Sequence, residues 1–71
     1  MDALYSDPKE RLYVYPRFLV RNNTYIQMTS IDYIESSGGD YWKIVFGGYN
    51  STVKPTDSNA FLEAIKAAFS S

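Results

Sequence analysis

The 71-residue sequence contains no cysteine and no histidine, and these absences exclude several kinds of chemistry. Without cysteine, the chain can form neither a disulfide nor a thiolate metal site. Without histidine, it lacks the side chain best suited to acid–base catalysis near neutral pH and the commonest metal ligand. We therefore expect a fold held together by apolar packing, with no metal and no cofactor.

The carboxylates do not replace the missing catalytic groups. Asp32 and Glu35 lie close together in the sequence, and two carboxylates can divide acid and base roles when their surroundings separate their pKa values. Neither has a neighbouring lysine, and both fit as solvated residues near a turn. The sequence therefore predicts a protein that is not an enzyme.

An excess of positive charge and a long apolar run are also missing. Seven basic residues are balanced by eight acidic ones, whereas domains that bind phosphate backbones unspecifically usually carry a strong basic excess. The uninterrupted apolar runs, such as Ile44 to Phe46, are far shorter than the roughly 20 residues that cross a bilayer. The first ten residues show no signal-peptide core. We expect a cytoplasmic protein.

The length allows one small domain, spanning residues 1–71, whose core buries only about 60% of the unfolded surface. Residues 1–9 mix small, acidic and proline residues without periodicity, which predicts a flexible lead-in. Residues 11–15 predict a strand, with Leu12 and Val14 on one face and Tyr13 and Tyr15 on the other. Pro16 interrupts this strand, either at a bend or at an edge position.

Alternation resumes after Pro16. It predicts Phe18 and Val20 in the core phase and Arg17 and Arg21 on the solvent face. Residues 22 and 23, both asparagine, predict a tight turn because asparagine tolerates the left-handed conformation. The return strand, residues 24–29, directs Ile26 and Met28 to the core.

The buried series then runs 26, 28, 31, 34, which no flat strand can produce. It predicts a bulge or a short helical turn near Ser30. After a turn at residues 36–40, residues 41–46 predict the clearest strand, with Trp42, Ile44 and Phe46 on one face. Gly47 and Gly48 predict a third turn, followed by a more polar strand over residues 49–54.

The last segment predicts a helix. Residues 56–59 offer several N-caps, and the following AFLEAIKAAF places Phe61, Leu62, Ile65, Ala68 and Phe69 on one stripe. A helix of about 12 residues is marginal alone, so a sheet or a second chain must cover this stripe. The predicted fold is α+β: a curled antiparallel β meander of five or six strands with one C-terminal helix.

Two resemblances follow from these patterns. The segment LYSDPKERLYVYPRFLVRNNTYIQMTSIDYIES, a glycine-containing turn, and YWKIVFGGYNSTVKPTDSNAFLEAIKAAF together resemble a compact bacterial pleckstrin-homology-like domain, which implies a PH-like arrangement of the strands and the helix. The hairpin IDYIESSGGDYWKI also resembles the opening part of LytTR-type DNA-binding domains. That family carries its DNA-contacting residues in strands beyond the helix. This resemblance therefore implies a β-hairpin over these residues and does not imply DNA binding.

The tyrosines are the main candidates for a binding surface, because many fall out of phase with the aliphatic core positions. Together with nearby basic residues they predict a partner-binding set, namely Tyr13, Tyr15, Arg17, Arg21, Tyr25, Tyr41, Lys43 and Tyr49. Such a surface favours a protein partner, since Tyr and Arg are preferred anchors. The alternatives are a surface that stacks nucleic-acid bases and cross-strand tyrosine pairs that merely stabilise the sheet. We expect a homodimer, formed through the outer tyrosines or through the edge at residues 49–53.

Overall fold

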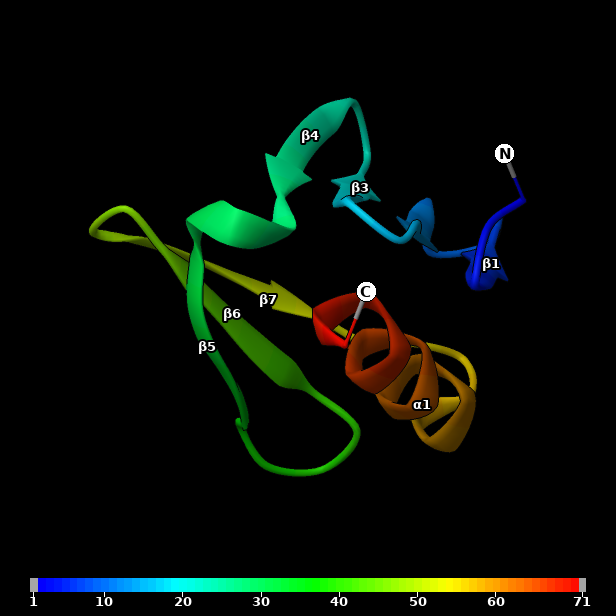
Figure 1. Ribbon diagram of the computed structural model, residues 1–71. Coiled ribbons are helices and arrows are strands. Elements are labelled where there is room, and N and C mark those ends of the chain that lie inside the picture. Colours follow the sequence, from blue (N-terminus) through cyan, green and yellow to red (C-terminus); the bar gives the residue numbers. More distant parts are fainter. Residues whose placement is uncertain (1, 71) are drawn as a thin grey trace.

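The computed structural model of the chain describes residues 2–70. Within this range, seven strands form two antiparallel sheets, and a helix follows them at the C-terminal end (Figure 1). The α+β class and the meander closed by a C-terminal helix are confirmed. The number of strands is seven instead of the predicted five or six.

The first sheet is a meander of four strands that pair in sequence order. The strands are β1 (Tyr5–Asp7), β2 (Leu12–Val14), β3 (Phe18–Arg21) and β4 (Thr24–Gln27). The predicted turn between β3 and β4 is confirmed, because Arg21 pairs with Thr24 and Asn22 has a φ of 55°. Asparagine is one of the few residues other than glycine that adopt this left-handed conformation readily.

Strand β1 corrects the prediction of a flexible lead-in over residues 1–9. Residues 5–7 pair with β2, and Tyr5 and Asp7 are both buried. The sequence concealed this strand because one of its two inward side chains is a carboxylate, which alternation of apolar residues cannot detect. Met1 lies outside the described residues.

The phase slip after β4 is confirmed. A short 3-10 helix, η1 (Met28–Ser30), leads into β5 (Ile31–Ser36), and the pairing of β5 shifts by one residue between Ile31 and Tyr33. The slip allows Met28 and Ile31 to be buried although they are three residues apart. It also turns the chain from the first sheet into the second.

The second sheet contains β5, β6 (Trp42–Phe46) and β7 (Tyr49–Val53) in that order. Strands β6 and β7 are joined by a two-residue turn in which Gly47 and Gly48 have φ values of 52° and 83°. Both residues must be left-handed in the turn type that suits the twist of a hairpin, so glycine is favoured there. The predicted inward face of β6 is confirmed, since Ile44 is fully buried and Trp42 and Phe46 pack against the core.

Helix α1 (Ser58–Phe69) begins after Asp57, whose side chain accepts a hydrogen bond of 3.1 Å from the Ala60 N–H. Asp57 is one of the four residues that the sequence offered as N-caps. The buried stripe differs from the prediction, because Ala64 belongs to it with Phe61, Ile65 and Ala68. Residues 61, 64, 65 and 68 follow the spacing of one narrow face. Leu62 and Phe69 each lie one residue beyond that face, and they are half-buried and exposed, respectively.

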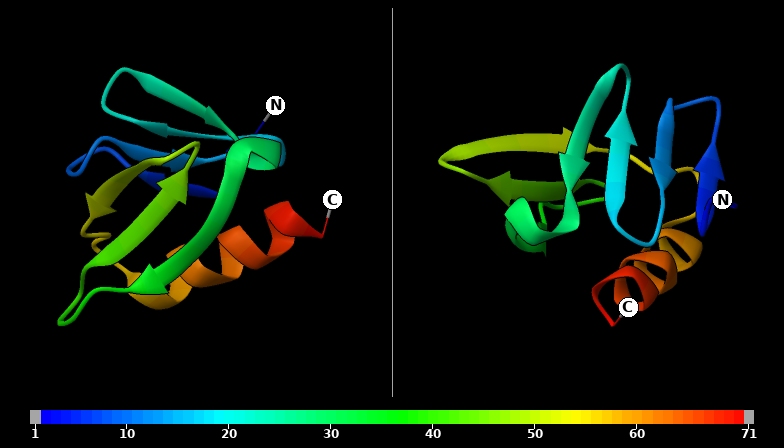
Figure 2. Two further views of the ribbon diagram at one scale, coloured as in Figure 1. Left: turned by 90° about the vertical axis from the view of Figure 1, so that its left-hand side faces the viewer. Right: turned by 45° about the horizontal axis from the view of Figure 1, so that its top comes forward.

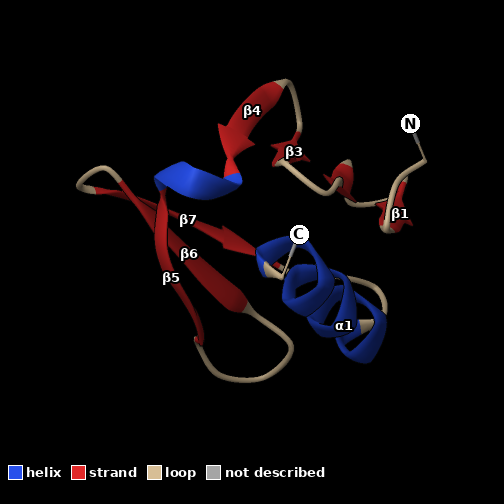
Figure 3. Ribbon diagram, viewed as in Figure 1, coloured by secondary structure: helices blue, strands red, loops and turns tan. Residues whose placement is uncertain are grey.

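The core lies where the two sheets and the helix face one another (Figures 2 and 3). Its largest fully buried side chains come from all three elements: Leu12, Val14 and Leu19 from the first sheet, Ile44 from the second, and Phe61 from α1. Neither sheet could bury its apolar face alone. Among residues 2–70, no helix is both long and apolar enough to span a membrane.

Candidate functional site

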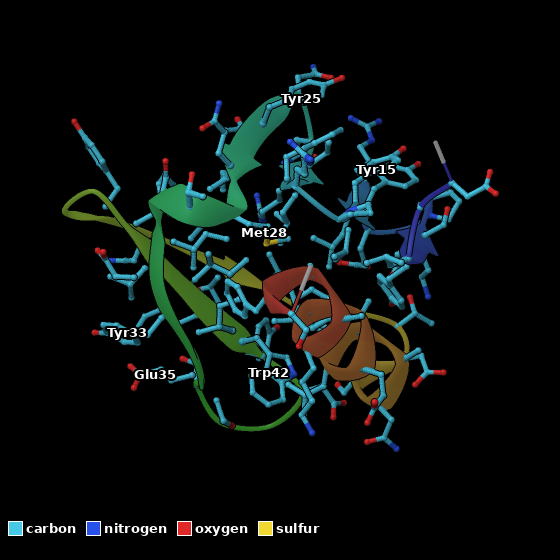
Figure 4. The ribbon with its side chains drawn as sticks, viewed as in Figure 1. Tyr15, Tyr25, Met28, Tyr33, Glu35 and Trp42 are labelled. Atoms are coloured by element: carbon cyan, nitrogen blue, oxygen red, sulfur yellow. The ribbon has the colours of Figure 1, made fainter. Side chains whose placement is uncertain are left out.

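The register of the first sheet decides which side chains face away from the core. Val14, Leu19 and Ile26 lie opposite one another across β2, β3 and β4, and all three are buried. The neighbouring row is Tyr13, Val20 and Tyr25, which therefore lies on the other face of the sheet. Tyrosines thus occupy the outer face, as Figure 4 shows for Tyr25.

Phe18 lies on this outer face and not in the core as predicted. Residues 16 and 17 form a tight turn, closed by a hydrogen bond of 2.8 Å from the Tyr15 N–H to the Phe18 carbonyl. The turn places Phe18 opposite Tyr15 on the same face, whereas a continuous strand would have placed it with Val14. Leu19 takes the core position. Val20 is buried as predicted, but on the outer face between its cross-strand neighbours Tyr13 and Tyr25.

Three rings form a continuous row across this surface. The Tyr15 and Phe18 rings stack with centroids 4.6 Å apart and an interplanar angle of 18°, and the Tyr25 ring lies 5.8 Å from that of Phe18. Both separations fall in the range of favourable aromatic pairs. We call Tyr13, Tyr15, Phe18 and Tyr25 the aromatic face. Tyr25 is 71% exposed, so most of its ring contributes nothing to the packing of the sheet.

A groove of about 770 Å³ continues from the aromatic face to the C-terminal end of α1. It lies beside β4, and Figure 2 shows the β2–β3 turn close to the helix there. Its lining is mainly apolar and comprises Pro16, Arg17, Phe18, Tyr25, Gln27, Met28, Thr29, Ala68 and Phe69. Phe69 is 49% exposed. Arg17 is the single charged residue in this lining.

The eight residues predicted to bind a partner do not form one surface. Tyr13, Tyr15 and Tyr25 share the aromatic face, with Arg17 at the turn beside it. Arg21 pairs with Leu12 and Thr24, which puts it on the opposite face of the sheet. It lines a second cavity of about 380 Å³ between the β3–β4 and β6–β7 turns, together with Tyr49.

The remaining two predicted residues lie near the second sheet and have partners there. The Lys43 ammonium is 3.1 Å from the Glu35 carboxylate. The Tyr41 ring lies beneath the Lys54 ammonium, which is 5.6 Å from the ring centroid. Tyr49 contacts Phe46 with centroids 6.3 Å apart. These residues therefore do not extend the aromatic face.

Sequence reasoning missed Phe18, Gln27 and Phe69 as members of the groove. A signal for Phe18 was present, since a two-residue turn at Pro16 and Arg17 pairs residue 15 with residue 18. No comparable signal exists for Phe69, because its position depends on how the helix docks against the first sheet.

Among residues 2–70, the buried charged side chain is that of Asp7, which is 4% exposed. Its carboxylate accepts hydrogen bonds from the Tyr5 hydroxyl at 2.7 Å, the Thr56 N–H at 2.8 Å, the Thr56 hydroxyl at 3.0 Å and the Glu10 N–H at 3.3 Å. Burial opposes ionisation of Asp7, but these four donors together outweigh it and hold the pKa of the carboxyl below its usual value. Burial, assisted by the bond to Asp7, raises the pKa of Tyr5.

The Asp7 cluster links two distant parts of the chain. It ties β1 to the segment that precedes α1, 49 residues later in the chain. The groups that donate hydrogen bonds to the Asp7 carboxylate all belong to the protein itself. The other two carboxylates considered above, Asp32 and Glu35, are exposed on β5 of the second sheet. The arrangement stabilises the fold.

Comparison with protein-family models, curated proteins and solved structures gives no significant match. The resemblances to pleckstrin-homology-like and LytTR-type domains therefore stay predictions. Functional inference rests on the geometry of the surface itself.

Proposed function

We propose that this protein is a non-enzymatic binding module that holds a protein partner on its aromatic face. The observation that carries the proposal is the row of rings from Tyr15 through Phe18 to Tyr25, which continues into an apolar groove. Aromatic residues and arginine are the side chains most enriched at the centres of protein interfaces. Arg17 lies beside the rings, so one surface offers both.

The high exposure of Tyr25 favours binding over a purely stabilising role. Cross-strand pairing explains why Tyr13 and Val20 are opposite one another. It does not explain a tyrosine that leaves 71% of its surface in solvent. Burying such rings against a partner contributes roughly 25 cal/mol for each Å² of apolar area.

A nucleic-acid partner has less support. Base-stacking proteins combine exposed rings with a positive groove that follows the phosphate backbone. Here Arg21 lies on the opposite face of the sheet from the rings, and Lys43 is paired with Glu35. A strand stacked on the aromatic face would meet Arg17 as the one basic residue of the groove.

Site-specific photocrosslinking tests the proposal. A benzophenone amino acid replaces Tyr25 in one variant and Tyr33, which is 50% exposed on β5, in the matched control. In cells that naturally contain the protein, position 25 should give a discrete protein adduct that position 33 does not give. Equal adduct patterns at both positions, or retention on nucleic acid that falls with salt and disappears in Arg17→Ala, would contradict the proposal.

Self-association is a second candidate function, favoured by the edge of the second sheet. Strand β7 is an edge strand whose sequence, YNSTV, contains neither proline nor charge, and its Tyr49 is 72% exposed. Such an edge can pair with a second copy around a two-fold axis. Sedimentation equilibrium should then give twice the 8.1 kDa mass of one chain at high micromolar concentration. Thr52→Pro should restore the single-chain mass, and a single-chain mass for the unmodified protein would exclude the dimer.

A further inference from the structure

Strand β4 is a short edge strand that has no proline, charged residue or bulge to protect it. It is the last strand of the first sheet, and its sequence, TYIQ, contains no proline and no charged residue. Its pairing with β3 has no bulge. By contrast, β5 at the edge of the second sheet has a shifted register and carries Asp32 and Glu35. Exposed, unprotected edges are templates for an added strand.

The register of β4 also shows which backbone groups are free to pair. Antiparallel partners alternate between residues that exchange hydrogen bonds and residues that do not. The two-residue turn makes Arg21 and Thr24 a bonded pair, and the Met28 N–H donates to the Arg17 carbonyl at 2.9 Å further along. Tyr25 pairs with Val20 at the next position, where the two residues do not exchange backbone hydrogen bonds. Its N–H and C=O therefore point away from β3, toward the open edge.

The groove that Tyr25 and Gln27 of β4 help to line has a definite chemical character. Phe18, Met28 and Phe69 give it apolar walls. Arg17 supplies a positive charge, and no acidic residue lines the groove. Residues 2–70 contain one ion pair, which joins Lys43 and Glu35. The Arg17 guanidinium therefore has no carboxylate partner within this part of the chain. An occupant that matches the groove brings a carboxylate, which arginine binds through two parallel hydrogen bonds.

We propose that β4 and its groove bind an extended segment of a partner protein, which adds to the first sheet as a fifth strand. The segment places an apolar side chain against Phe18 and Phe69 and an Asp or Glu side chain against Arg17. This inference rests on the proposed function and names the chemistry of the partner. Addition of a strand to a sheet edge takes affinity from main-chain hydrogen bonds and specificity from neighbouring pockets.

Selection of a phage-displayed library of random heptapeptides on the purified full chain tests the inference. The unmodified protein should enrich peptides in which an apolar residue and an acidic residue recur at a fixed spacing. Arg17→Glu should enrich peptides with lysine or arginine at the acidic position and should bind the original peptides at least about tenfold more weakly. An absence of enrichment, or the same consensus from both proteins, would overturn the proposal.

A second pair of variants tests strand addition separately from side-chain contacts. Tyr25→Ala removes the ring and keeps the N–H, whereas Tyr25→Pro also removes the N–H that points to the open edge. With a synthetic peptide of the selected sequence, Tyr25→Pro should bind at least about tenfold more weakly than Tyr25→Ala. Equal affinities would refute the added strand. If Tyr25→Pro does not fold, hydrogen exchange of the Tyr25 amide in the unmodified protein gives the same decision, because the peptide must protect it.

The two levels of proposal fail in different ways. If position 25 forms no specific protein adduct in cells, the binding function itself is wrong. If it forms one but the peptides show no acidic preference, or the adduct is a second copy of this chain paired through β4, the function stands and the proposed partner chemistry is wrong.

Discussion

Replacing Asp7 by asparagine should remove a large share of the stability of this protein. Each carboxylate oxygen accepts from one rotatable hydroxyl and one fixed backbone N–H: Oδ1 from the Thr56 hydroxyl and the Glu10 N–H, Oδ2 from the Tyr5 hydroxyl and the Thr56 N–H. An asparagine side chain has one oxygen and one NH₂ group in these two places. The hydroxyl that meets the NH₂ can rotate and accept from it. The backbone N–H that faces the NH₂ group is itself a donor, so it cannot accept a hydrogen bond and loses its partner.

The least costly orientation turns the NH₂ toward Glu10, because the bond from that N–H is the longest of the four at 3.3 Å. The N–H then loses its acceptor, which costs about 1–3 kcal/mol. The bonds that persist change from charged to neutral, and each weakens by about 1 kcal/mol. Asparagine is neutral, so the cost of burying a charge disappears, and this offsets about 2 kcal/mol of these losses. We therefore expect Asp7→Asn to lower the free energy of unfolding by about 2–4 kcal/mol at pH 7. A domain of this size has about 4–10 kcal/mol in total.

The pH dependence gives an independent check with a definite sign. The folded-state pKa of Asp7 lies below its unfolded value, so the carboxylate contributes stability above the unfolded pKa of about 3.9, and this contribution is lost as the pH falls through the folded pKa. The stability difference between the unmodified protein and Asp7→Asn should therefore be largest near neutral pH. It should shrink steadily below about pH 4.

Urea denaturation followed by the fluorescence of Trp42, the single tryptophan, measures both effects. Asp57→Asn is the matched control, because asparagine caps a helix as well as aspartate does and should change stability by less than about 0.5 kcal/mol. A loss below about 1 kcal/mol for Asp7→Asn, or a difference that stays constant between pH 7 and pH 3, would refute the account of Asp7 as a buried, fully bonded carboxylate.

Three further changes test other parts of the fold. Trp42→Ala should cost about 2–4 kcal/mol in urea denaturation followed by circular dichroism, since Trp42 packs against the core while half-buried; a cost as small as that of the exposed control Tyr33→Ala would place it on the surface. Gly48→Ala should cost about 1–2 kcal/mol because its φ is 83°, whereas the neighbouring Asn50→Ala should be nearly neutral; equal effects would contradict the turn geometry. Since the pKa of Tyr5 is raised in the folded state, its contribution to stability is complete below about pH 10 and is lost at higher pH; Tyr5→Phe should flatten this alkaline decrease, and an unchanged slope would show that Tyr5 does not cause it.

The elements that the sequence predicted well are those specified by neighbouring residues. The turns at residues 22–23 and 47–48 need left-handed backbone, and asparagine and glycine supply it. The Asp57 cap lies three residues from the N–H that it binds. The irregularity near Ser30 followed from counting apolar positions, because the period of two cannot continue through 26, 28, 31 and 34. These signals act over a few residues and need no knowledge of the tertiary fold.

Strand β1 could not be predicted in this way. Its inward residues are Tyr5 and Asp7, and Asp7 is stable in the interior because Thr56 donates two hydrogen bonds from the far end of the chain. A buried carboxylate without partners would cost several kcal/mol, so the sequence pattern alone correctly disfavours it. The partners become visible only when the segment before α1 is placed beside β1. The same dependence on docking hides Phe69, whose exposure follows from the position of the helix end.

The aromatic face illustrates a third kind of dependence, on the parity of a turn. Counting through Pro16 as if the strand continued keeps Phe18 in phase with Leu12 and Val14, and it puts Arg17 and Arg21 together on the outside. The two-residue turn at Pro16 and Arg17 reverses this parity, so Phe18 stacks on Tyr15 and Arg21 moves to the opposite face. This reversal concentrates the rings and separates the basic residues. A surface with many rings and one cation matches an apolar, acidic protein segment better than a phosphate backbone, and the choice between these two partners therefore depends on how the chain turns at residues 16 and 17.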